Sequence, residues 1–349
     1  AKLIRFIFQR LLLFSLVLSV NTSCSDEPAS DADTRLRLTV VTSISGLGDM
    51  GYNDNMMSGI MRFYEHHDVN MSLIRPNSLD EVQQAIQNWQ ESTKEGPRSL
   101  LLLADNAYEP VLENSSLALA PQQQVLLVES KNTRLPEGVC TFNINRYGIS
   151  YLAGCMARKH QEACVIAAMP DNPILEEAVK GYTDGYQTDN DKKVKVIYLA
   201  DDTSGFNMPD SAYRVTGTID NAFIFPLAGG SNNGIYKYSR ETPFYMSLVA
   251  GMDADCSLFS SRIPFSVVIY IDRLLENYLV AWYEGQEFEP FRTYGMDSGM
   301  ADIIMNPVFY KYLEIAKKAL SGTIGNNWNN AYRKYKDEAL EKEMSYVAN

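Results

Sequence analysis

The sequence predicts an α/β protein made of two doubly wound lobes, each built around a parallel sheet. Short apolar runs alternate with amphipathic stretches of helix length along most of the chain, as in folds where helices connect parallel strands. Most runs are apolar on both faces, which is typical of strands covered by helices on both sides. Eight strands over roughly 250 residues fit two lobes better than one. They are expected at 36–42, 69–74, 99–104, 124–129, 163–168, 193–200, 221–228 and 245–251.

Helices are expected between these strands. Apolar residues from Met56 to Tyr64 recur at spacings of three and four, which predicts an amphipathic helix that begins near Asp54. Ser78 is suited to cap the next helix, and Pro173 is suited to the first position of another. Two further helices are expected at about 264–284 and at 326–349, the second one charged and exposed.

Composition argues against a largely disordered chain and against a nucleic-acid-binding protein. Of the 349 residues, 46% are hydrophobic and 21% are charged, which is typical of a globular protein. The formal net charge is −12, and no basic stripe is present, so binding to nucleic acid is disfavoured. Cys140, Cys155, Cys164 and Cys256 form no C-x-x-C pair, so no metal site is expected. Cys164 is expected to be buried, and a disulfide between Cys155 and Cys164 is left open.

The first 23 residues have the features of an export signal. Basic residues precede the apolar run LLLFSLVLSV at 11–20, which is too short to span a bilayer. Small residues then precede Cys24, which resembles a bacterial lipoprotein signal in which the cysteine is acylated. We expect a signal peptide at 1–23, a lipid anchor on Cys24 and a flexible acidic tether at 24–35. An ordinary signal peptide with an incidental cysteine is the alternative.

The segment SGLGDMGYNDN at 45–55 contains the pattern G-x-G-x-x-G directly after the first expected strand. This pattern is compatible with a dinucleotide such as NAD, whose pyrophosphate rests on a helix N-terminus. The Asp49 carboxylate inside the loop would repel phosphate, however, and the second strand lacks the terminal acidic residue that binds the ribose. We therefore expect no dinucleotide cofactor.

The same loop is better suited to a small polar ligand. Asp49, Tyr52 and Asn53 bring a carboxylate, an aromatic ring and an amide to the carboxyl end of the first strand. Open α/β sheets bind ligands at this edge. The alternative is that Asn53 or Asp54 caps the following helix while Tyr52 packs against it, and for Asp54 we favour the capping role.

Five segments carry a resemblance to a known family. They are GDMGYND (48–54), RYGISYLAGCMAR (146–158), DDTSGFNMPDSAYR (201–214), FPLAGGSNNGIYKYSRE (225–241) and VAGMDADCSLF (249–259). In this order they resemble the basic membrane protein family, substrate-binding lipoproteins of bacterial ABC transporters that include purine nucleoside receptors. The resemblance extends from about residue 36 to residue 304.

The resemblance implies a type I periplasmic-binding-protein fold, in which three crossovers join the lobes and the ligand binds in the cleft between them. The first lobe is then expected at 36–145 plus about 256–290. The second lobe is expected at 146–255 plus about 291–325. The C-terminal helix at 326–349 follows them.

The resemblance also implies roles for individual residues. Tyr52 matches the family's aromatic residue that stacks on a nucleobase, and Asn53 matches the neighbouring base-binding asparagine. Phe206 matches the aromatic residue that closes over the other face of the base. Asp253 matches the aspartate that accepts hydrogen bonds from ribose hydroxyls. The complete expected ligand-binding set is Asp49, Tyr52, Asn53, Asp105, Phe206, Gly230 and Asp253.

Two departures from the family pattern concern the identity of the ligand. Ile269 occupies the position of a family lysine that reaches the ligand. Tyr52 replaces the commoner phenylalanine and adds a hydroxyl group. The resemblance therefore predicts a nucleoside-like solute, with a purine nucleoside favoured, and leaves the individual ligand open.

We expect a lipid-anchored binding protein of the cell envelope, on the periplasmic face or the outer surface, that serves an ABC-type permease. Neither G-x-S-x-G nor H-E-x-x-H occurs, and the chain has only three histidines, so no enzyme is expected. The alternatives are an exported enzyme on the same scaffold, and a surface sensor or adhesin. The enzyme would be an NAD-dependent oxidoreductase or a nucleoside hydrolase using Asp253 and Asp255.

Overall fold

The computed structural model describes residues 33–187, 192–309 and 328–347. One compact unit, Leu36–Asn349, contains both lobes. The expected signal peptide, the anchor at Cys24 and most of the tether lie outside the described residues. No helix in the described part of the chain is long and apolar enough to cross a membrane.

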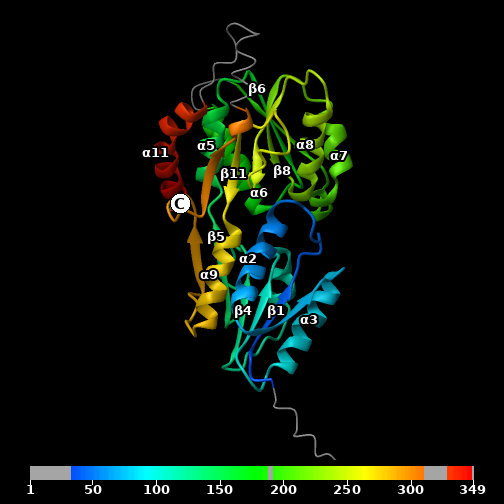
Figure 1. Ribbon diagram of the computed structural model, residues 1–349, viewed down its shortest axis with the longest axis vertical. Helices are drawn as coiled ribbons and strands as arrows, with labels where there is room; N and C mark the ends of the chain where they lie inside the picture. Colours follow the sequence, from blue (N-terminus) through cyan, green and yellow to red (C-terminus); the bar gives the residue numbers. More distant parts are fainter. Residues whose placement is uncertain (1–32, 188–191, 310–327, 348–349) are drawn as a thin grey trace, which may run out of the picture. The chain divides into compact units, whose positions relative to one another are not determined.

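The first lobe contains a six-stranded sheet in the order β12-β5-β4-β3-β1-β2, and every pairing in it is parallel (Figure 1). Its strands are β1 (Leu36–Val41), β2 (Val69–Ile74), β3 (Ser99–Leu103), β4 (Gln123–Leu127), β5 (Val139–Ile144) and β12 (Phe291–Tyr294). Its helices are α2 (Tyr52–His66), α3 (Leu79–Ser92), α4 (Glu109–Glu113) and α9 (Ile271–Tyr283), which packs on α2. All five residues of β3 are buried, as expected for a strand covered on both faces.

The second lobe contains two sheets. The order β7-β6-β8-β9 is parallel throughout, whereas in β10-β11-β13 the last strand is antiparallel. The strands are β6 (Glu162–Ala167), β7 (Val194–Tyr198), β8 (Ala222–Leu227), β9 (Leu248–Val249), β10 (Gly251–Asp253), β11 (Phe265–Ile269) and β13 (Ala301–Met305). The helices are α5 (Tyr147–Ala157), α6 (Pro173–Gln187), α7 (Pro209–Thr216), α8 (Asn232–Glu241) and α11 (Trp328–Val347).

All eight expected strands occur, although the last divides into β9 and β10. The structure adds β5, β11, β12 and β13, which the sequence pattern missed. The helix expected at 264–284 is wrong in its first part, because residues 265–269 form β11 and the helix begins only at Ile271. FSVVI is rich in β-branched residues and wholly buried, which favours a central strand.

The chain crosses between the lobes three times within the described residues. The crossings lie between β5 and α5, between β11 and α9, and between β12 and β13. Strand pairing differs from the expected lobe division at two places. Strand β11, expected in the first lobe, pairs with β10 and β13 of the second. Strand β12, expected in the second lobe, pairs with β5 of the first.

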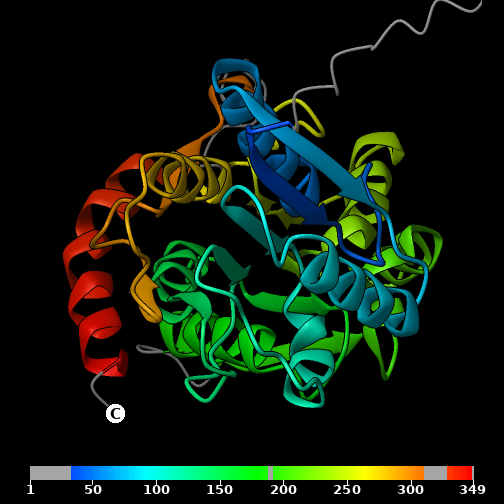
Figure 2. The same ribbon diagram turned by 90° about the horizontal axis from the view of Figure 1, so that it is seen from below.

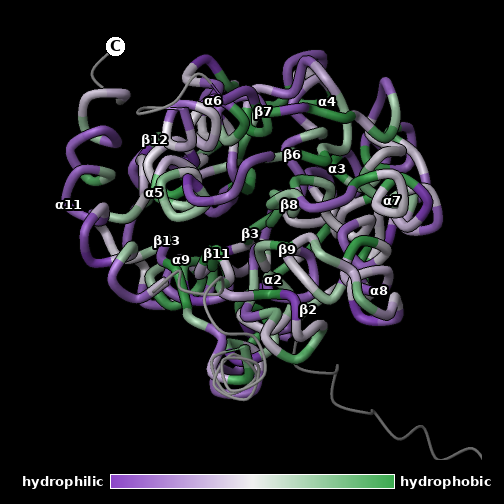
Figure 3. Tube along the Cα trace, turned by 90° about the horizontal axis from the view of Figure 1, so that it is seen from above, coloured by the Kyte–Doolittle hydropathy of each residue, from purple (hydrophilic) through white to green (hydrophobic). Residues whose placement is uncertain are grey.

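The C-terminal helix α11 is present, but the expectation of an exposed helix is wrong for one of its faces. It packs against α5, and both ribbon views show it on the outer side of that helix (Figures 1 and 2). Trp328, Ala339 and Glu343 are buried. The Tyr346 ring stacks on Tyr147 with centroids 4.3 Å apart. Most residues of α11 are nevertheless hydrophilic, as the colour of its tube shows (Figure 3). The sequence pattern did not indicate this buried face, because charged residues dominate the composition of the helix.

Among the cysteines in the described residues, Cys140, Cys164 and Cys256 are free thiols. Cys164 is buried in β6, as its apolar surroundings predict. Cys155 lies in α5 and is also buried. The disulfide that the sequence left open between these two residues is not formed.

Candidate functional site

A cavity of about 280 Å³ lies where the carboxyl ends of strands from both lobes meet. Its charged and polar lining residues are Ser43, Ser45, Asp49, Tyr52, Asn53, Asp105, Asn106, Glu129, Arg146, Asn172, Asn207, Asn233 and Asp253. Its apolar lining residues are Leu47, Ala104, Val128, Ile174, Leu175, Phe206, Pro209, Leu227 and Met252. Polar groups that converge on a cavity beside apolar side chains are typical of small-molecule sites.

All seven residues that the sequence predicts for ligand binding line this cavity. They come from distant parts of the chain: the loop and helix after β1, and the segments after β3, β7 and β8, with Asp253 at the end of β10. This convergence follows from topology, because parallel strands bring their carboxyl ends to the same edge of a sheet. Contact of these residues with a ligand stays a prediction.

Asp49 uses its carboxylate to hold the N-terminus of α2. Its oxygens accept hydrogen bonds from the backbone N–H groups of Gly51 at 2.9 Å, Asn53 at 2.8 Å and Asp54 at 3.1 Å. A carboxylate in this place satisfies unpaired N–H groups and interacts favourably with the helix dipole. The N-cap position is occupied by Gly51, and the side chain that satisfies these N–H groups is that of Asp49. The alternative in which Asn53 or Asp54 caps the helix, which we favoured for Asp54, is therefore wrong.

Asp54 and two glycines shape the loop that precedes α2. The Asp54 carboxylate accepts the N–H groups of Gly48 at 2.7 Å and Met50 at 2.8 Å. Gly46 and Gly48 have φ values of 81° and 93°, which favour glycine. The Asn53 side-chain amide donates to the Gly46 carbonyl at 3.1 Å. The N–H groups that a pyrophosphate would need are thus largely occupied by carboxylates.

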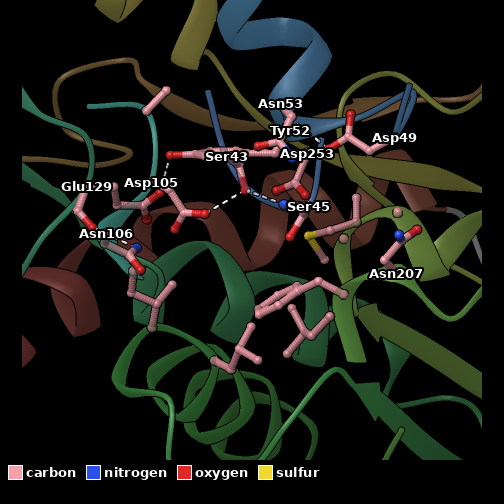
Figure 4. A pocket seen from close by; sticks show the side chains of 18 of the residues that line it. Ser43, Ser45, Asp49, Tyr52, Asn53, Asp105, Asn106, Glu129, Asn207 and Asp253 are labelled. Atoms are coloured by element: carbon pink, nitrogen blue, oxygen red, sulfur yellow. Dashed lines mark hydrogen bonds between the residues drawn. The ribbon is translucent and has the colours of Figure 1, made fainter. Parts of the chain in front are cut away.

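The Tyr52 side chain is held in place by two contacts, one at its hydroxyl group and one at its ring. Its hydroxyl donates a hydrogen bond to Glu129, and the two side chains meet in the cavity (Figure 4). The Arg146 guanidinium lies 5.5 Å from the centre of the Tyr52 ring, within cation–π range. Burial raises the pKa of the Tyr52 hydroxyl well above its usual value, with a further contribution from the Glu129 charge. The hydroxyl is therefore a neutral donor to Glu129.

Glu129 and Arg146 are cavity residues that the sequence reasoning missed. Arg146 donates from Nε and Nη2 to the two oxygens of Glu129 at 2.9 and 2.8 Å. Both side chains are nearly buried, with exposed fractions of 11% and 3%. The signal for Glu129 was present, because this residue ends the expected strand 124–129 at the ligand-binding edge of the sheet. Arg146 lies in the first crossover, where no strand-end rule applies.

Asp253 ends β10 and lies within reach of Arg146. Its Oδ1 accepts from Arg146 Nη1 at 3.3 Å. Its backbone has a φ of 68°, an uncommon conformation for a residue other than glycine. Burial raises the pKa of the Asp253 carboxyl to about 6, against the opposing effect of the Arg146 charge. Asp253 is therefore mainly ionised at neutral pH.

Asp105 follows β3 and caps a short 3-10 helix. Its carboxylate accepts from the Ser43 hydroxyl at 2.5 Å and from the Ala107 N–H at 2.9 Å. Burial raises the pKa of this carboxyl as well. Figure 4 shows Asp105 and Ser43 facing each other beside Glu129. Asp105 therefore lines the cavity with a carboxylate that already accepts two hydrogen bonds.

Phe206 and Gly230 approach each other on the second lobe. Phe206 lies in the 3-10 helix Thr203–Asn207 after β7. A Cβ atom on Gly230 would lie 3.2 Å from the Phe206 carbonyl oxygen and 3.4 Å from the Asp49 Cβ. A larger residue at position 230 would therefore crowd both lobes, so glycine permits their close approach.

The charge of the cavity is acidic. Asp49, Asp105, Glu129 and Asp253 line it, and Arg146 is the only Lys or Arg among the described lining residues. Ile269, at the position of the family lysine, is 1% exposed in β11 and does not line the cavity. Across the described part of the chain, no group of three or more His, Cys, Asp or Glu residues is arranged to hold a metal ion.

Comparison with known proteins identifies relatives of this chain. The family model described as "ABC transporter substrate-binding protein PnrA-like" matches residues 37–327. No curated protein matches the chain. A solute-binding protein of an ABC transporter system from Aeropyrum pernix K1 has a TM-score of 0.68 at 17% identity, covering 90% of this chain and 91% of that one.

Two further solved structures are similar. A periplasmic solute-binding protein of an ABC transporter from Actinobacillus succinogenes 130z, with bound D-allose, has a TM-score of 0.58 at 11% identity and covers 80% and 100% of the two chains. A transcriptional activator of the comK gene from Bacillus halodurans has a TM-score of 0.57 at 17% identity and covers 83% and 99%. At such identities the similarity shows the fold alone. The predicted type I periplasmic-binding-protein fold is confirmed.

Proposed function

The chain belongs to the PnrA-like family of ABC transporter substrate-binding proteins, and from this premise we propose that its cleft binds an uncharged nucleoside-like solute. A purine nucleoside is the favoured ligand. We further propose that the protein is held to the cell envelope by a lipid on Cys24. It would deliver the solute to the permease of an ABC-type uptake system.

The observation that carries the proposal is the composition of the cavity wall. Tyr52 from the first lobe and Phe206 from the second line the same cavity as the buried Asp253 carboxylate. A planar base between two rings gains about 0.5–1.5 kcal/mol per aromatic pair beyond area burial. A carboxylate that faces two neighbouring hydroxyl groups accepts charge-assisted hydrogen bonds and disfavours deoxy analogues, which leave an oxygen unpaired.

The charge of the cavity supports a ligand without phosphate. Four carboxylates surround a single arginine, and Arg146 is already paired with Glu129. A nucleotide would bring negative charge into a partly buried acidic site, where repulsion is weakly screened. The volume of about 280 Å³ lies just below the usual range of roughly 300–1,000 Å³ for ligand pockets. A small neutral solute therefore fits these constraints best.

A thermal-shift screen of the purified protein against nucleosides, free bases and monosaccharides tests the ligand class. A ligand present at 100 times its Kd adds about 2.7 kcal/mol to the free energy of unfolding. We expect a purine nucleoside to stabilise the protein, and Asp253→Asn to abolish the effect. Asp272→Asn is a matched control, because Asp272 pairs with Arg62 and does not line the cavity. Stabilisation by a monosaccharide alone would show that the substrate class is wrong.

Two assays separate binding from the other proposed properties. Incubation with inosine followed by measurement of free hypoxanthine tests for hydrolysis, and turnover would replace the binding function by an enzymatic one. Labelling of growing cells with radioactive palmitate tests the anchor. Label that is lost in Cys24→Ala supports lipidation of Cys24, and label that persists in this variant contradicts it.

A further inference from the structure

Four side chains form a continuous chain of polar contacts through the cavity. Tyr52 donates to Glu129, Glu129 accepts two hydrogen bonds from Arg146, and Arg146 reaches Asp253. Tyr52 and Glu129 belong to the first lobe, Arg146 lies in the first crossover, and Asp253 ends a strand of the second lobe. The guanidinium of Arg146 therefore connects groups that belong to different lobes.

The contacts of Arg146 are unequal. Glu129 receives two hydrogen bonds in a bidentate pair at 2.8 and 2.9 Å, whereas Asp253 receives one contact at 3.3 Å. Among the described residues, no other donor reaches the Asp253 carboxylate, so its second oxygen is available to a ligand. The bidentate pair neutralises Glu129 and compensates the charge of Asp253 only in part.

Burial makes this partial compensation important. The Asp253 side chain is only 12% exposed, and desolvation favours the protonated form of a carboxyl group. A protonated carboxyl group accepts weaker hydrogen bonds than a carboxylate and must place its own proton. The nearby guanidinium opposes protonation and also limits rotation of the carboxylate.

On the basis of the proposed function, we propose that Arg146 is a positioning residue that determines specificity: it holds Asp253 ionised and oriented, so that the cleft prefers ligands with two neighbouring hydroxyl groups. Arg146 acts through Asp253 and needs no contact with the ligand. An arginine suits this role, because its charge persists at all relevant pH values and its fork spans two carboxylates.

The charged groups around Asp253 predict that removal of Arg146 and removal of the Glu129 charge shift the Asp253 pKa in opposite directions. The ionisable groups that act on it or are acted on by it are Asp49, Tyr52, Glu129, Arg146, Tyr236 and Cys256. Burial raises the pKa of Asp253 to about 6, Arg146 lowers this pKa, and Glu129 raises it. Removal of Arg146 should therefore raise the Asp253 pKa further. Removal of the Glu129 charge should lower the Asp253 pKa.

The first test needs no ligand. The carboxyl carbon of Asp253 is assigned by comparison with Asp253→Asn and titrated by NMR in the purified protein. We expect a midpoint near pH 6 in the parent protein, a higher one in Arg146→Met and a lower one in Glu129→Gln. Arg62→Met is the matched control, because Arg62 also pairs with two carboxylates, Asp272 and Glu276, and does not line the cavity. Its midpoint should stay at that of the parent protein.

Equal midpoints in the parent protein, Arg146→Met and Glu129→Gln would overturn the inference. Midpoint shifts in the same direction in the two variants would also overturn it. Glu129→Gln keeps the shape of the side chain and serves as the test if Arg146→Met does not fold. Arg146→Lys keeps the charge but loses the bidentate geometry, and its midpoint should lie between those of the parent protein and Arg146→Met. A purely structural role of Arg146 predicts no such order.

The second test measures discrimination between inosine and 2′-deoxyinosine by calorimetry at pH 8. The ratio of the Kd for 2′-deoxyinosine to the Kd for inosine measures this discrimination. We expect this ratio to fall at least tenfold in Arg146→Met, to fall less in Arg146→Lys and to be unchanged in Arg62→Met. An unchanged ratio in Arg146→Met would overturn the inference although nucleosides bind. Failure of the parent protein to bind any nucleoside would instead overturn the proposed function, and the titration of Asp253 would still decide the role of Arg146.

Discussion

Asn233 donates a hydrogen bond from its side-chain amide to the backbone carbonyl oxygen of Asp49, with 2.7 Å between the two atoms. Asn233 lies in the first turn of α8 in the second lobe, and Asp49 precedes α2 in the first. The same amide contacts the Gly230 carbonyl at 3.1 Å. This bond joins the two lobes beside the cavity, at the position where hinge closure would bring them together.

Loss of this bond should weaken ligand binding. Asn233→Ala removes one interlobe hydrogen bond, which typically contributes about 0.5–1.5 kcal/mol, so the affinity should fall roughly twofold to twelvefold. Stopped-flow measurements should attribute the loss to faster dissociation, because the bond forms only when the lobes meet. Asn114→Ala is the control, because the Asn114 side-chain amide donates a local hydrogen bond to the carbonyl oxygen of Pro110 in α4. An unchanged dissociation rate in Asn233→Ala would show that this contact does not hold the lobes together.

Two variants of Tyr52 separate the ring from its hydroxyl. Tyr52→Phe removes the hydrogen bond to Glu129, which still accepts from Arg146. We expect unfolding to require about 0.5–1.5 kcal/mol less free energy, with affinity for the ligand within threefold of the parent protein. Tyr52→Ala also removes the ring and should weaken binding at least tenfold. Equal losses of affinity in the two variants would mean that the ring does not contact the ligand.

Ligand binding should depend on pH through Asp253. Its carboxyl has a pKa raised by burial to about 6 in the free protein. A ligand that donates to the carboxylate binds the ionised form, so the affinity should be highest above pH 7 and fall as the pH drops through 6. Titration calorimetry between pH 5 and pH 8 measures this profile. Affinity that is constant over this range would exclude Asp253 as the acceptor.

Glu343 should make the stability of the fold depend on pH. Burial raises the pKa of this carboxyl to about 7, while hydrogen bonds from the Met296 and Asp297 N–H groups oppose the rise. The folded state keeps the Glu343 proton to a higher pH than the unfolded chain does. Protonation of Glu343 therefore stabilises the fold at low pH, and this contribution to the free energy of unfolding is lost as the pH rises from about 5 through 7.

Denaturant unfolding of Glu343→Gln measures this effect. The variant should lose less stability between pH 5 and pH 8 than the parent protein, with a difference in slope of at most about 1.4 kcal/mol per pH unit. Glu341→Gln on the same helix is the control, because Glu341 is exposed. An identical pH dependence in Glu343→Gln and the parent protein would mean that Glu343 titrates equally in the folded and unfolded states.

Gly59 should be essential for the packing of α2 on α9. A Cβ atom at this position would lie 2.1 Å from the Asp272 carbonyl oxygen, which belongs to the backbone of α9 and cannot turn away. Gly59→Ala should therefore destabilise the fold by more than about 2 kcal/mol, although alanine favours helices. Denaturant unfolding measures this loss, and Ser58→Ala on the exposed side of α2 is the control. A Gly59→Ala variant as stable as the parent protein would show that the two helices can separate without cost.

Local patterns predicted most of the secondary structure. The eight apolar runs became strands, and Ser78 caps α3 by accepting from the Glu81 N–H, as its residue type predicts. The prediction failed at residues 265–269, which run directly into an amphipathic helix and were assigned to it. Their β-branched residues favour a strand, and they pair with β10 and β13.

The sequence alone determined the polar loop after β1 and the acidic balance of the chain, because these depend on residue types, and its resemblance to a known family added residues such as Phe206 and Asp253 to the expected site. Only the tertiary structure decided how those residues are used. Asp49 caps α2, the Tyr52 hydroxyl is bound to Glu129, and Arg146 connects Glu129 to Asp253. These partners are separated by up to 107 positions in sequence. Their pairing depends on strand order and on the crossovers, which no local pattern encodes.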